Sequence, residues 1–523
     1  MTDPAQERTL PRMVAAAVAR YGDRPAIEDS DTRYSFRELG AAAERVGRAL
    51  VASGCQHGDR VSIWAPNVAE WVVAAIGIQS IGAVLVPLST RHKGAEAAYQ
   101  LQKSGARWLF TVAGFLDTDY VGMLEGQDLP DLEGLVLLRG EDPRATSFGA
   151  FLAQGDATSD EAFRARADAV SPDDMLDMLF TSGTTGKPKG VMTDHGQNLA
   201  VFETWSGLIS LCDDDRYLVV APFFHTFGYK AGWLSSVMRG ATIVPQAVFD
   251  AEDVLQRIER ERITVMPGAP TIYQSLLSVP DWQRFDLSSL RAATTGAAAI
   301  PVALIRQMKE ELGFDLVLTA YGLTESCGTV SMCEPDDDPE TIANTSGKPI
   351  PGVEVRCVDP DGKDVKPGEP GEIWVRGFNV MRGYFDAAEQ TKETITADGW
   401  LRTGDIGVMD ARGYLQITDR LKDMFIMGGF NCYPAEIENL MFSHDAIAQV
   451  AVIGVPDERM GEVGMAFVVP APGHTPDADG LIAWCREQMA NYKVPRRVEI
   501  VDALPINAGG KVDKVALRAR AAA

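Results

Sequence analysis

Short apolar runs alternate with segments of helical periodicity through about the first 350 residues, and this alternation limits the folds open to the chain. In residues 254–262, for example, Val254 and Ile258 fall one turn apart on the same side of a helix. A repeated order of strand, turn, helix and strand is typical of parallel α/β sheets. We therefore predict an α/β fold for this part. The apolar runs are residues 61–64, 84–86, 175–180, 217–220, 263–266 and 316–319.

The pattern changes after residue 352. Segments such as 353–358 and 372–376 are separated by Asp-Gly, Pro-Gly and Arg-Gly turns, which indicates antiparallel β structure up to about residue 417. We place a boundary near residues 419–423, followed by a smaller α+β unit. A chain of 523 residues that is 46% hydrophobic can bury several cores. We therefore predict an N-terminal domain of residues 1–419 and a C-terminal domain of residues 420–523.

The formal net charge of −24 narrows the partners that the chain can bind. A field of this sign repels nucleic acid and anionic membranes, so neither is expected as a partner. It also repels ligands that carry phosphate groups. Any phosphate site must therefore rest on local Lys, Arg and backbone N–H groups.

The cysteines and the N-terminal segment favour a cytoplasmic location. The seven cysteines are scattered, odd in number and without a Cys-x-x-Cys pair, which favours reduced thiols over a disulfide framework. The six histidines form no His-x-x-x-His or Cys/His cluster, so a structural zinc site is not expected. Residues 1–20 carry acidic side chains and lack the apolar core of a signal peptide. No apolar stretch approaches the roughly 20 residues that a membrane span needs.

Residues 181–190, directly after the apolar run 175–180, form the strongest local signal for chemistry. The two glycines let the backbone approach a ligand closely, the hydroxyls add donors, and the lysines add positive charge. Such a loop can surround a polyphosphate, and a flexible Ser/Thr/Gly loop is the alternative. It differs from the P-loop pattern because two residues, not four, separate the glycines. The residues concerned are Thr181, Ser182, Gly183, Thr184, Thr185, Gly186, Lys187 and Lys189.

Six motifs in order resemble those of the adenylate-forming superfamily, which comprises acyl-CoA synthetases, nonribosomal adenylation domains and luciferases. The loop at 181–190 resembles its phosphate-binding signature, and the resemblance extends through nearly the whole chain. It implies a large N-terminal domain of two doubly wound α/β subdomains plus a small antiparallel β-barrel, followed by a smaller, mobile α+β C-terminal domain. The other motifs are residues 294–299 (adenine wall), 321–325 (magnesium and adenine), 401–405 (ribose), 419–423 (hinge) and 504–511 (catalytic lysine).

The resemblance implies a reaction that begins with ATP, Mg²⁺ and a carboxylic acid. Attack of the carboxylate on the α-phosphate gives an acyl-adenylate and releases pyrophosphate. The transition state spreads negative charge over phosphoryl oxygens, so catalysis depends on positioning and on cations. By resemblance, Glu325 holds Mg²⁺, and Lys511 places its ammonium between the acyl carboxylate and the α-phosphate. The same resemblance assigns Thr324 to the α-phosphate, Tyr321 and Gly322 to adenine, Gly296, Ala297 and Ala298 to the adenine wall, Asp405 to ribose, and Arg420 to ribose or phosphate.

The second step of such enzymes transfers the acyl group to a thiol, and the resemblance implies coenzyme A as the acceptor. The C-terminal domain turns about the hinge, withdraws the lysine and completes a thiol channel. Lys422 occupies the hinge position, where a surface lysine is the alternative. Gly428, Gly429 and Phe430 would permit close approach of a pantetheine arm. Cys432 has no His or cationic neighbour in the sequence, so a buried, inert thiol is expected.

The aromatic stretch at residues 222–232 suits the wall of an acyl pocket at a strand end. By resemblance His225 gates this pocket, and a core histidine is the alternative. Lys230 could meet a polar substrate group or extend outward. Within the superfamily, this stretch resembles actinobacterial ligases that act on fatty acids or on the propanoate side chain of a partly degraded steroid. The chain length of the acid cannot be predicted from the sequence, because an apolar pocket discriminates by only about 1–3 kcal/mol per methylene of the substrate.

The predicted function is that of an AMP-forming acyl-CoA ligase, and three alternatives stay open. An acyl-AMP ligase that loads a carrier protein typically has an inserted segment, and residues 352–419 contain no obvious one. Luciferase-like oxygenation has no specific support. An inactive scaffold on this fold would be expected to lose Glu325, Asp405 or Lys511, and all three are present. The oligomeric state is left open, with a homodimer as one option.

Overall fold

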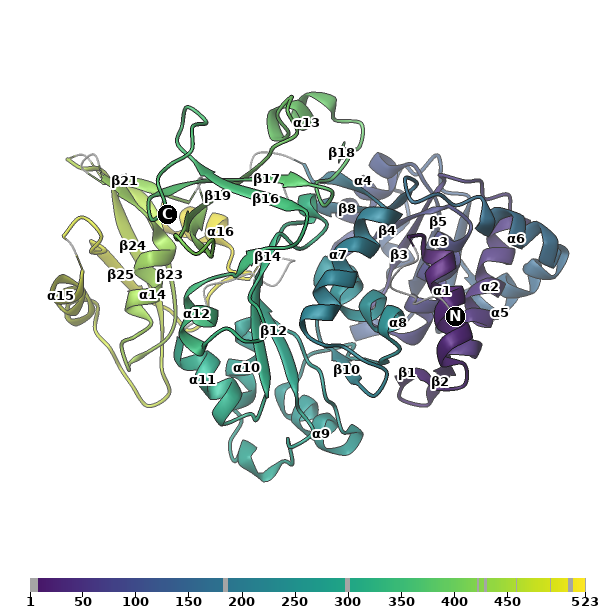
Figure 1. Cartoon of the computed structure of the whole chain (residues 1–523), viewed down its shortest axis with the longest axis horizontal. Helices are drawn as coiled ribbons and strands as arrows, with labels where there is room; N and C mark the ends of the chain where they lie inside the picture. The colour runs from purple at the N-terminus through teal and green to yellow at the C-terminus, as the bar shows by residue number, and fades with distance from the viewer. Residues whose placement is uncertain are drawn as a thin grey trace.

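The computed structural model describes residues 8–181, 187–296, 302–420, 423–427, 430–457, 459–489, 491–506 and 511–522. Figure 1 shows the N-terminal part as a broad layered body and the C-terminal part as a smaller lobe at the left. Each has its own hydrophobic core: the first extends from Leu10 to Leu415, and the second from Phe425 to Leu517. The change of core lies between residues 415 and 425, where the sequence predicts a domain boundary. The predicted limits of the two domains stay a prediction.

A mixed eight-stranded sheet contains the strand that leads into the predicted phosphate loop. Its central strands are parallel, whereas β9 and β18 are antiparallel to their neighbours. All four residues of β4 are buried, as is typical of parallel strands between two helical layers. The order is β18 (Gly383–Tyr384), β9 (Lys189–Asp194), β8 (Met175–Thr181), β4 (Val84–Pro87), β3 (Arg60–Trp64), β5 (Ala106–Val112), β6 (Gly134–Arg139) and β7 (Thr146–Ser147).

The helices of this first unit follow from local signals and from packing. Helix α2 begins with a capping box, in which the Glu38 backbone N–H donates to Ser35 Oγ and the Ser35 N–H donates to Glu38 Oε2. It packs closely on α3, since a Cβ at Gly77 would lie 2.6 Å from the Ala43 carbonyl oxygen. The helices are α1 (Leu10–Tyr21), α2 (Phe36–Ala52), α3 (Ala69–Ser80), α4 (Gly94–Ser104), α5 (Phe148–Gln154), α6 (Asp160–Asp168) and α7 (His195–Leu208).

A second α/β unit contains two four-stranded sheets, linked by isolated parallel bridges from Tyr217 to Val265 and from Val265 to Ala292. The two α/β units confirm the parallel α/β class that the alternating pattern predicts. The strands are β10 (Arg216–Val219), β11 (Thr242–Pro245), β1 (Pro25–Asp29) and β2 (Thr32–Ser35), then β12 (Ala292–Gly296), β13 (Leu316–Tyr321), β14 (Ser331–Met332) and β15 (Lys348–Pro349). The helices are α8 (Ser235–Arg239), α9 (Ala251–Glu261), α10 (Pro270–Leu277), α11 (Val302–Glu310) and α12 (Pro339–Asn344).

An antiparallel sheet follows, as the turn dipeptides after residue 352 predict. It contains β16 (Val353–Val358), β17 (Pro370–Gly377), β19 (Leu401–Met409) and β20 (Leu415–Arg420), in that order, and α13 (Ala388–Thr394) precedes β19. The C-terminal lobe combines a second, largely antiparallel sheet with helices, an α+β arrangement. Its elements are β21 (Phe425–Met427), β22 (Phe430–Cys432), α14 (Pro434–Met441), β23 (Ile447–Asp457), β24 (Gly461–Pro470), α15 (Ala478–Gln488), β25 (Arg497–Ile500) and α16 (Lys514–Ala521).

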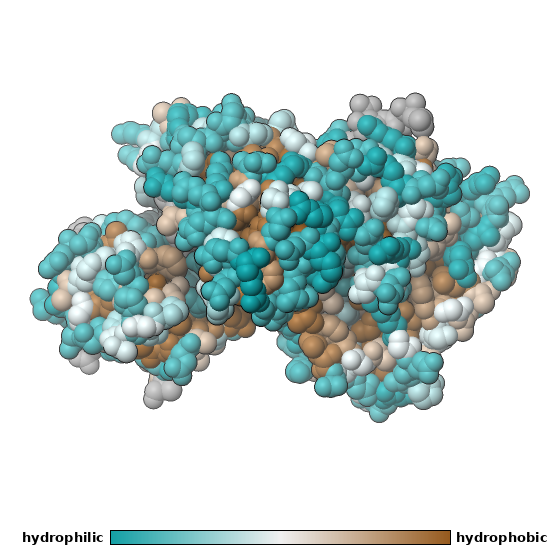
Figure 2. Space-filling view, turned by 90° about the horizontal axis from the view of Figure 1, so that it is seen from below, coloured by the Kyte–Doolittle hydropathy of each residue, from teal (hydrophilic) through white to brown (hydrophobic). Residues whose placement is uncertain are grey.

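The surface of the protein is largely hydrophilic on the face shown in Figure 2. The hydrophobic areas on this face are broken up by hydrophilic residues. Among the helices of the described ranges, none is both long and apolar enough to cross a membrane.

A buried histidine fastens the first helix to the rest of the N-terminal part. The Leu10 backbone N–H donates to His195 Nδ1 at 3.1 Å, and His195 is fully buried at the start of α7. Burial lowers the pKa of His195 to about 3; Asp174 opposes this shift and His57 adds to it. The ring is therefore neutral in the folded protein at any ordinary pH.

We expect His195 to reduce the free energy of unfolding by about 2 kcal/mol as the pH falls from 6.5 to 5. The pKa of the ring is below its ordinary value of 6.5 in the folded state. Below pH 6.5 the unfolded chain takes up a proton on this histidine that the folded chain excludes. The free energy of unfolding therefore decreases as the pH falls from 6.5 toward the lower pKa of the folded state. Urea unfolding at both pH values should show a smaller pH dependence in His195→Gln than in the parent. Equal pH dependence in the two proteins would contradict this expectation.

Candidate active site

Three of the predicted site residues lie at the carboxyl ends of strands that pair in parallel. Strand β8 ends at Thr181, β12 at Gly296 and β13 at Tyr321. In open α/β sheets ligands bind outside these strand ends. Residues 182–186, which complete the predicted phosphate loop, lie outside the described residues, as do Ala297 and Ala298 of the predicted adenine wall.

Glu325 is the centre of the first cluster. Its Oε1 accepts hydrogen bonds from Thr181 Oγ1 at 3.3 Å and from the Tyr384 hydroxyl at 3.0 Å. Burial and the nearby Glu325 carboxylate raise the pKa of Tyr384, so its hydroxyl stays a donor. Thr324 and Glu325 are both half-buried in a short 3₁₀ turn (Thr324–Ser326). The structure thus brings together two predicted residues that are 144 positions apart.

Two lysines border this cluster. Lys189 Nζ lies 4.7 Å from the ring centroid of Tyr384, and Lys187 Nζ lies 5.1 Å from that of Tyr99. The Tyr99 hydroxyl also donates to the Pro188 carbonyl oxygen at 3.0 Å. Cation–π contacts of this kind favour defined positions for the ammonium groups. The lysines therefore bring positive charge to the end of the loop in a chain whose overall charge is negative.

Sequence reasoning missed Tyr384. It belongs to a two-residue strand that pairs with β9, and its hydroxyl reaches Glu325 from 59 positions away. No local pattern marks it, since a lone tyrosine after glycine is common in loops and strand ends. The pairing of this short strand with β9 cannot be predicted from the sequence alone.

Tyr321 and Asp405 form the second cluster. The Tyr321 hydroxyl donates to Asp405 Oδ2 at 2.6 Å, and both side chains are buried. The Asp405 N–H donates to Thr403 Oγ1 at 3.1 Å. Asp405 also faces Arg420 in the register of β19 and β20, although the side chain of Arg420 lies outside what the structure describes. Two residues that are predicted to bind the nucleotide are thus in direct contact.

Two of the predicted glycines are required by close backbone approach. A Cβ on Gly296 would lie 2.4 Å from the Ala320 carbonyl oxygen, and one on Gly322 would lie 2.1 Å from the Gly328 carbonyl oxygen. A side chain on Gly296 would push the ends of β12 and β13 apart, and one on Gly322 would displace the backbone at Gly328. Close backbone packing therefore explains glycine at both positions.

His225 and Lys511 approach each other across the two lobes. Burial and the positive charge of Lys511 lower the pKa of His225 to about 4, so the ring is neutral near pH 7. The Phe227 N–H donates to His225 Nδ1 at 3.3 Å, which leaves the ring proton on Nε2. Asn67 holds the segment before His225, because its side-chain amide donates to the Ala221 carbonyl and accepts from the Phe223 N–H. The structure thus places the predicted catalytic lysine near the predicted acyl gate.

The remaining C-terminal predictions are only partly described. Lys422, Gly428 and Gly429 lie outside the described residues, and only the backbone of Phe430 is described, at the start of β22. Cys432 is buried, and burial raises the pKa of its thiol, in agreement with an inert cysteine. The hinge and thiol-channel roles stay predictions.

Lys230 corrects an expectation. The sequence allowed it to meet a substrate group or to extend outward, but its side chain is fully buried and pairs with Asp177 at 3.2 Å.

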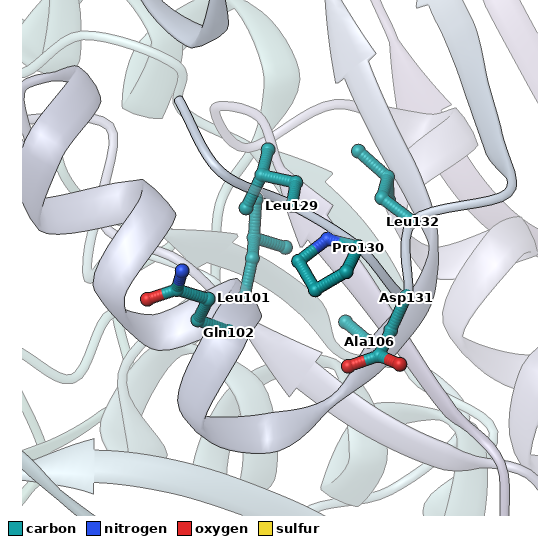
Figure 3. A pocket seen from close by; sticks show the side chains of 7 residues that line it. All are labelled: Leu101, Gln102, Ala106, Leu129, Pro130, Asp131 and Leu132. Carbon is teal, nitrogen blue, oxygen red and sulfur yellow. The ribbon is translucent and has the colours of Figure 1, made fainter. Parts of the chain in front are cut away.

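A surface depression between α4 and the segment before β6 is unrelated to these clusters, since it contains none of the predicted site residues (Figure 3). Its lining residues are Leu101, Gln102, Ala106, Leu129, Pro130, Asp131 and Leu132.

The donor set fits Mg²⁺ and a nucleotide. Mg²⁺ is usually bound through one or two carboxylates, water and substrate phosphates. A single half-buried Glu325 carboxylate beside Thr181, at the start of the predicted phosphate loop, and near Lys189 has this character. The fold, with these clusters at the strand ends, defines an adenylate-forming enzyme.

Comparison with known proteins gives the family. Residues 14–385 match the family described as AMP-binding enzyme, and residues 436–511 match the AMP-binding enzyme C-terminal domain. The chain belongs to the AMP-binding enzyme family. The resemblance that the six motifs indicate is therefore confirmed.

Two curated relatives match almost end to end. The chain is 50% identical over 519 residues to the 3-[(3aS,4S,7aS)-7a-methyl-1,5-dioxo-octahydro-1H-inden-4-yl]propanoyl:CoA ligase of Rhodococcus jostii, with 98% of this chain and 99% of the relative covered. It is 49% identical over 511 residues to the ligase of the same name from Mycobacterium tuberculosis, with 98% of each chain covered.

Solved structures agree with this assignment. The anthranilate CoA ligase AuaEII in complex with anthranoyl-AMP has a TM-score of 0.89 at 30% identity, with 100% of this chain and 99% of that chain covered. ATP-bound MatB from Rhodopseudomonas palustris has a TM-score of 0.87 at 29% identity, with 98% and 99% covered. The predicted fold class and the predicted enzyme class, an AMP-forming acyl-CoA synthetase, are confirmed.

Proposed function

We propose that the chain activates a propanoate side chain carried by a saturated bicyclic diketone, and transfers the resulting acyl group to coenzyme A. The observation that carries this proposal is the 50% identity over 98% of the chain to a ligase named for such an acid. The half-buried Phe224 and Phe227, which flank His225 in the sequence, support an apolar acid, because apolar walls with few polar groups are typical of acyl pockets.

The first step joins the acid to AMP. A carboxylate oxygen attacks the α-phosphorus of ATP, the bond from that phosphorus to the bridging oxygen breaks, and pyrophosphate leaves. We assign Glu325 to Mg²⁺, which when bound neutralises charge on the phosphate oxygens. Thr324 and Lys511 would contact the reacting phosphate and carboxylate, and the effect of the Lys511 charge on the pKa of His225 supports this placement. The predicted loop 181–190 would hold the polyphosphate.

The nucleoside would lie between the strand ends. Asp405 would accept hydrogen bonds from the ribose hydroxyls, and its bond from Tyr321 supports a fixed orientation for that carboxylate. Gly296, Ala297 and Ala298 would form the adenine wall, Gly322 would lie near adenine together with Tyr321, and Arg420 would reach ribose or phosphate.

In the second step the thiol sulfur of coenzyme A attacks the acyl carbonyl, loses its proton, and AMP leaves as its phosphate oxygen takes the electron pair. Lys511 serves the first step only, so it must withdraw before the thiol enters. We propose that the C-terminal lobe turns about the segment that contains Lys422, and that Gly428, Gly429 and Phe430 then border the pantetheine arm. The separate cores on either side of this segment support independent motion.

The substrate assay tests the proposal directly. Coenzyme-A-dependent AMP release is measured with the bicyclic dione propanoate, and with short, medium and long fatty acids and an aromatic acid. We expect kcat/KM to be at least about tenfold higher for the bicyclic acid than for any other, because each apolar group lost costs about 1–3 kcal/mol. A fatty acid that equals it would overturn the substrate assignment. AMP release that needs a carrier protein instead of coenzyme A would favour the acyl-AMP ligase alternative.

We also propose a cytoplasmic location for the protein. All seven cysteines are free and six of them are buried, which supports a reducing, cytoplasmic environment. A homodimer stays a prediction.

A further inference from the structure

A lysine and an aspartate are paired in the middle of the N-terminal core. Lys230 Nζ lies 3.2 Å from Asp177 Oδ2, and both side chains are completely buried. No other ion pair found among the described residues has both partners fully buried. Removing two charges from water is expensive, and a well-packed apolar pair is often at least as stable. Stability alone therefore gives no reason for charges at this place.

The pair belongs to a connected hydrogen-bond network. Lys230 Nζ also donates to Thr193 Oγ1 at 3.1 Å, and Thr193 Oγ1 donates to Asp177 Oδ1 at 2.6 Å. Asn198 Nδ2 donates to Thr193 Oγ1 at 2.9 Å. The Tyr229 hydroxyl contacts Asp177 and accepts from the Gln79 side chain. Each member is held by at least one other, so the network fixes the relative positions of its elements.

These elements are the ones that carry the candidate site. Asp177 lies on β8, four residues before Thr181, and Thr193 lies on β9, four residues after Lys189. The network therefore joins both arms of the hairpin whose turn is the predicted phosphate loop. Lys230 lies five residues after His225, in a π-helix (Phe227–Leu234). Helices of this kind are rare and are frequent at functional sites.

The segment that follows Glu325, the proposed Mg²⁺ ligand, also contacts this hydrogen-bond network. Cys327 follows Glu325 by two residues, is fully buried, and has a left-handed backbone with φ of 56°. Its thiol contacts Thr193 and lies in the field of Lys230. Three segments that must act together in adenylation thus converge on one buried ion pair.

We propose that Lys230 and Asp177 are positioning residues for the adenylation step: their ion pair holds the π-helix behind His225 in register with the hairpin that carries the phosphate loop. The proposal rests on the proposed roles of His225 and of the loop. Neither residue touches substrate, since both are fully buried. The effect on the reaction comes through the geometry of the groups that do.

The test uses the double variant Lys230→Met/Asp177→Asn, which removes both charges while Asn keeps an acceptor for Thr193. We expect a Tm within a few degrees of the parent, because an apolar group replaces a costly buried charge. Acyl-AMP formation, by pyrophosphate exchange, should fall at least about tenfold, since small misplacements of reacting groups are costly. Thioester formation from supplied acyl-AMP should change less than about twofold.

A matched control distinguishes positioning from general loosening. Arg291 and Asp215 form an ion pair that is only partly buried, at the opposite ends of β10 and β12 from the site. Arg291→Met/Asp215→Asn should change Tm without selectively lowering adenylation. A folded Lys230→Met/Asp177→Asn protein with parental adenylation, or with both half-reactions lowered equally, would overturn the proposal.

Two further measurements keep the test decisive. If the double variant does not fold, Thr193→Val removes the link between the pair and β9 without a change of charge. It should still lower acyl-AMP formation several-fold, and parental rates would again overturn the proposal. Hydrogen exchange of residues 175–194 and 223–234 should be faster in the variants but not in the control. Hydrogen exchange needs no substrate. If the wild-type protein were inactive on every acid, the proposed function would be refuted, but hydrogen exchange would still test the role of the Lys230–Asp177 pair.

Discussion

Lys511→Ala is expected to lower acyl-AMP formation by about 10²–10³-fold, because one preorganised charge that stabilises a developing anion is worth about this much. The structure brings the Lys511 charge close enough to lower the pKa of His225. An ammonium at this place can neutralise the carboxylate and the α-phosphate as they approach. The two half-reactions should be measured separately, by pyrophosphate exchange and by single-turnover thioester formation from supplied acyl-AMP.

Thioester formation should stay near the parental rate in this variant, because the lysine acts only in the first step. Lys366→Ala is the control, since Lys366 is exposed in the loop between β16 and β17 and outside both clusters. The pKa of His225 should also rise in Lys511→Ala, because one of its two causes of lowering is removed. Equal loss of both half-reactions in a folded protein would show that the lysine has a different role.

The second large effect is expected for Glu325→Gln, with acyl-AMP formation lowered by about 10²-fold at low Mg²⁺. The substitution keeps the size of the side chain and an oxygen that can accept from Thr181 and Tyr384. It removes the negative charge that a hard cation prefers. Titration of the adenylation rate with Mg²⁺ should therefore show a higher half-saturating concentration than in the parent.

Glu311→Gln serves as the matched control, because Glu311 is an exposed carboxylate beyond α11. It should leave the Mg²⁺ titration unchanged. A Glu325→Gln protein that matches the parent at every Mg²⁺ concentration would remove Glu325 from the metal site. Its carboxylate would then serve only as the acceptor for the two hydroxyls.

Local patterns predicted the elements of the fold well. The apolar run 175–180 is β8 (Met175–Thr181), and the periodic segment 254–262 lies largely within α9 (Ala251–Glu261). The turn dipeptides after residue 352 predicted the antiparallel sheet. These signals act over a few residues, where side-chain period and turn chemistry are decided by the neighbouring chain.

The candidate site was predicted in part. The motifs named Thr181, Glu325, Tyr321 and Asp405, and the structure places them in two contacting pairs. Tyr384 was missed, because its partner Glu325 is 59 positions away and only the pairing of β18 with β9 brings them together.

The sequence by itself determined the class of the fold, the order of the motifs and which residue types stand at the strand ends. Only the tertiary structure decided what each charged side chain meets. Lys230 shows the difference, since from the sequence it could point toward substrate or solvent, and the fold instead buries it against Asp177, 53 positions away. The physical reason is that the free energy of a buried charge depends on partners brought near by the whole fold, whereas helix and strand formation depends mainly on adjacent residues.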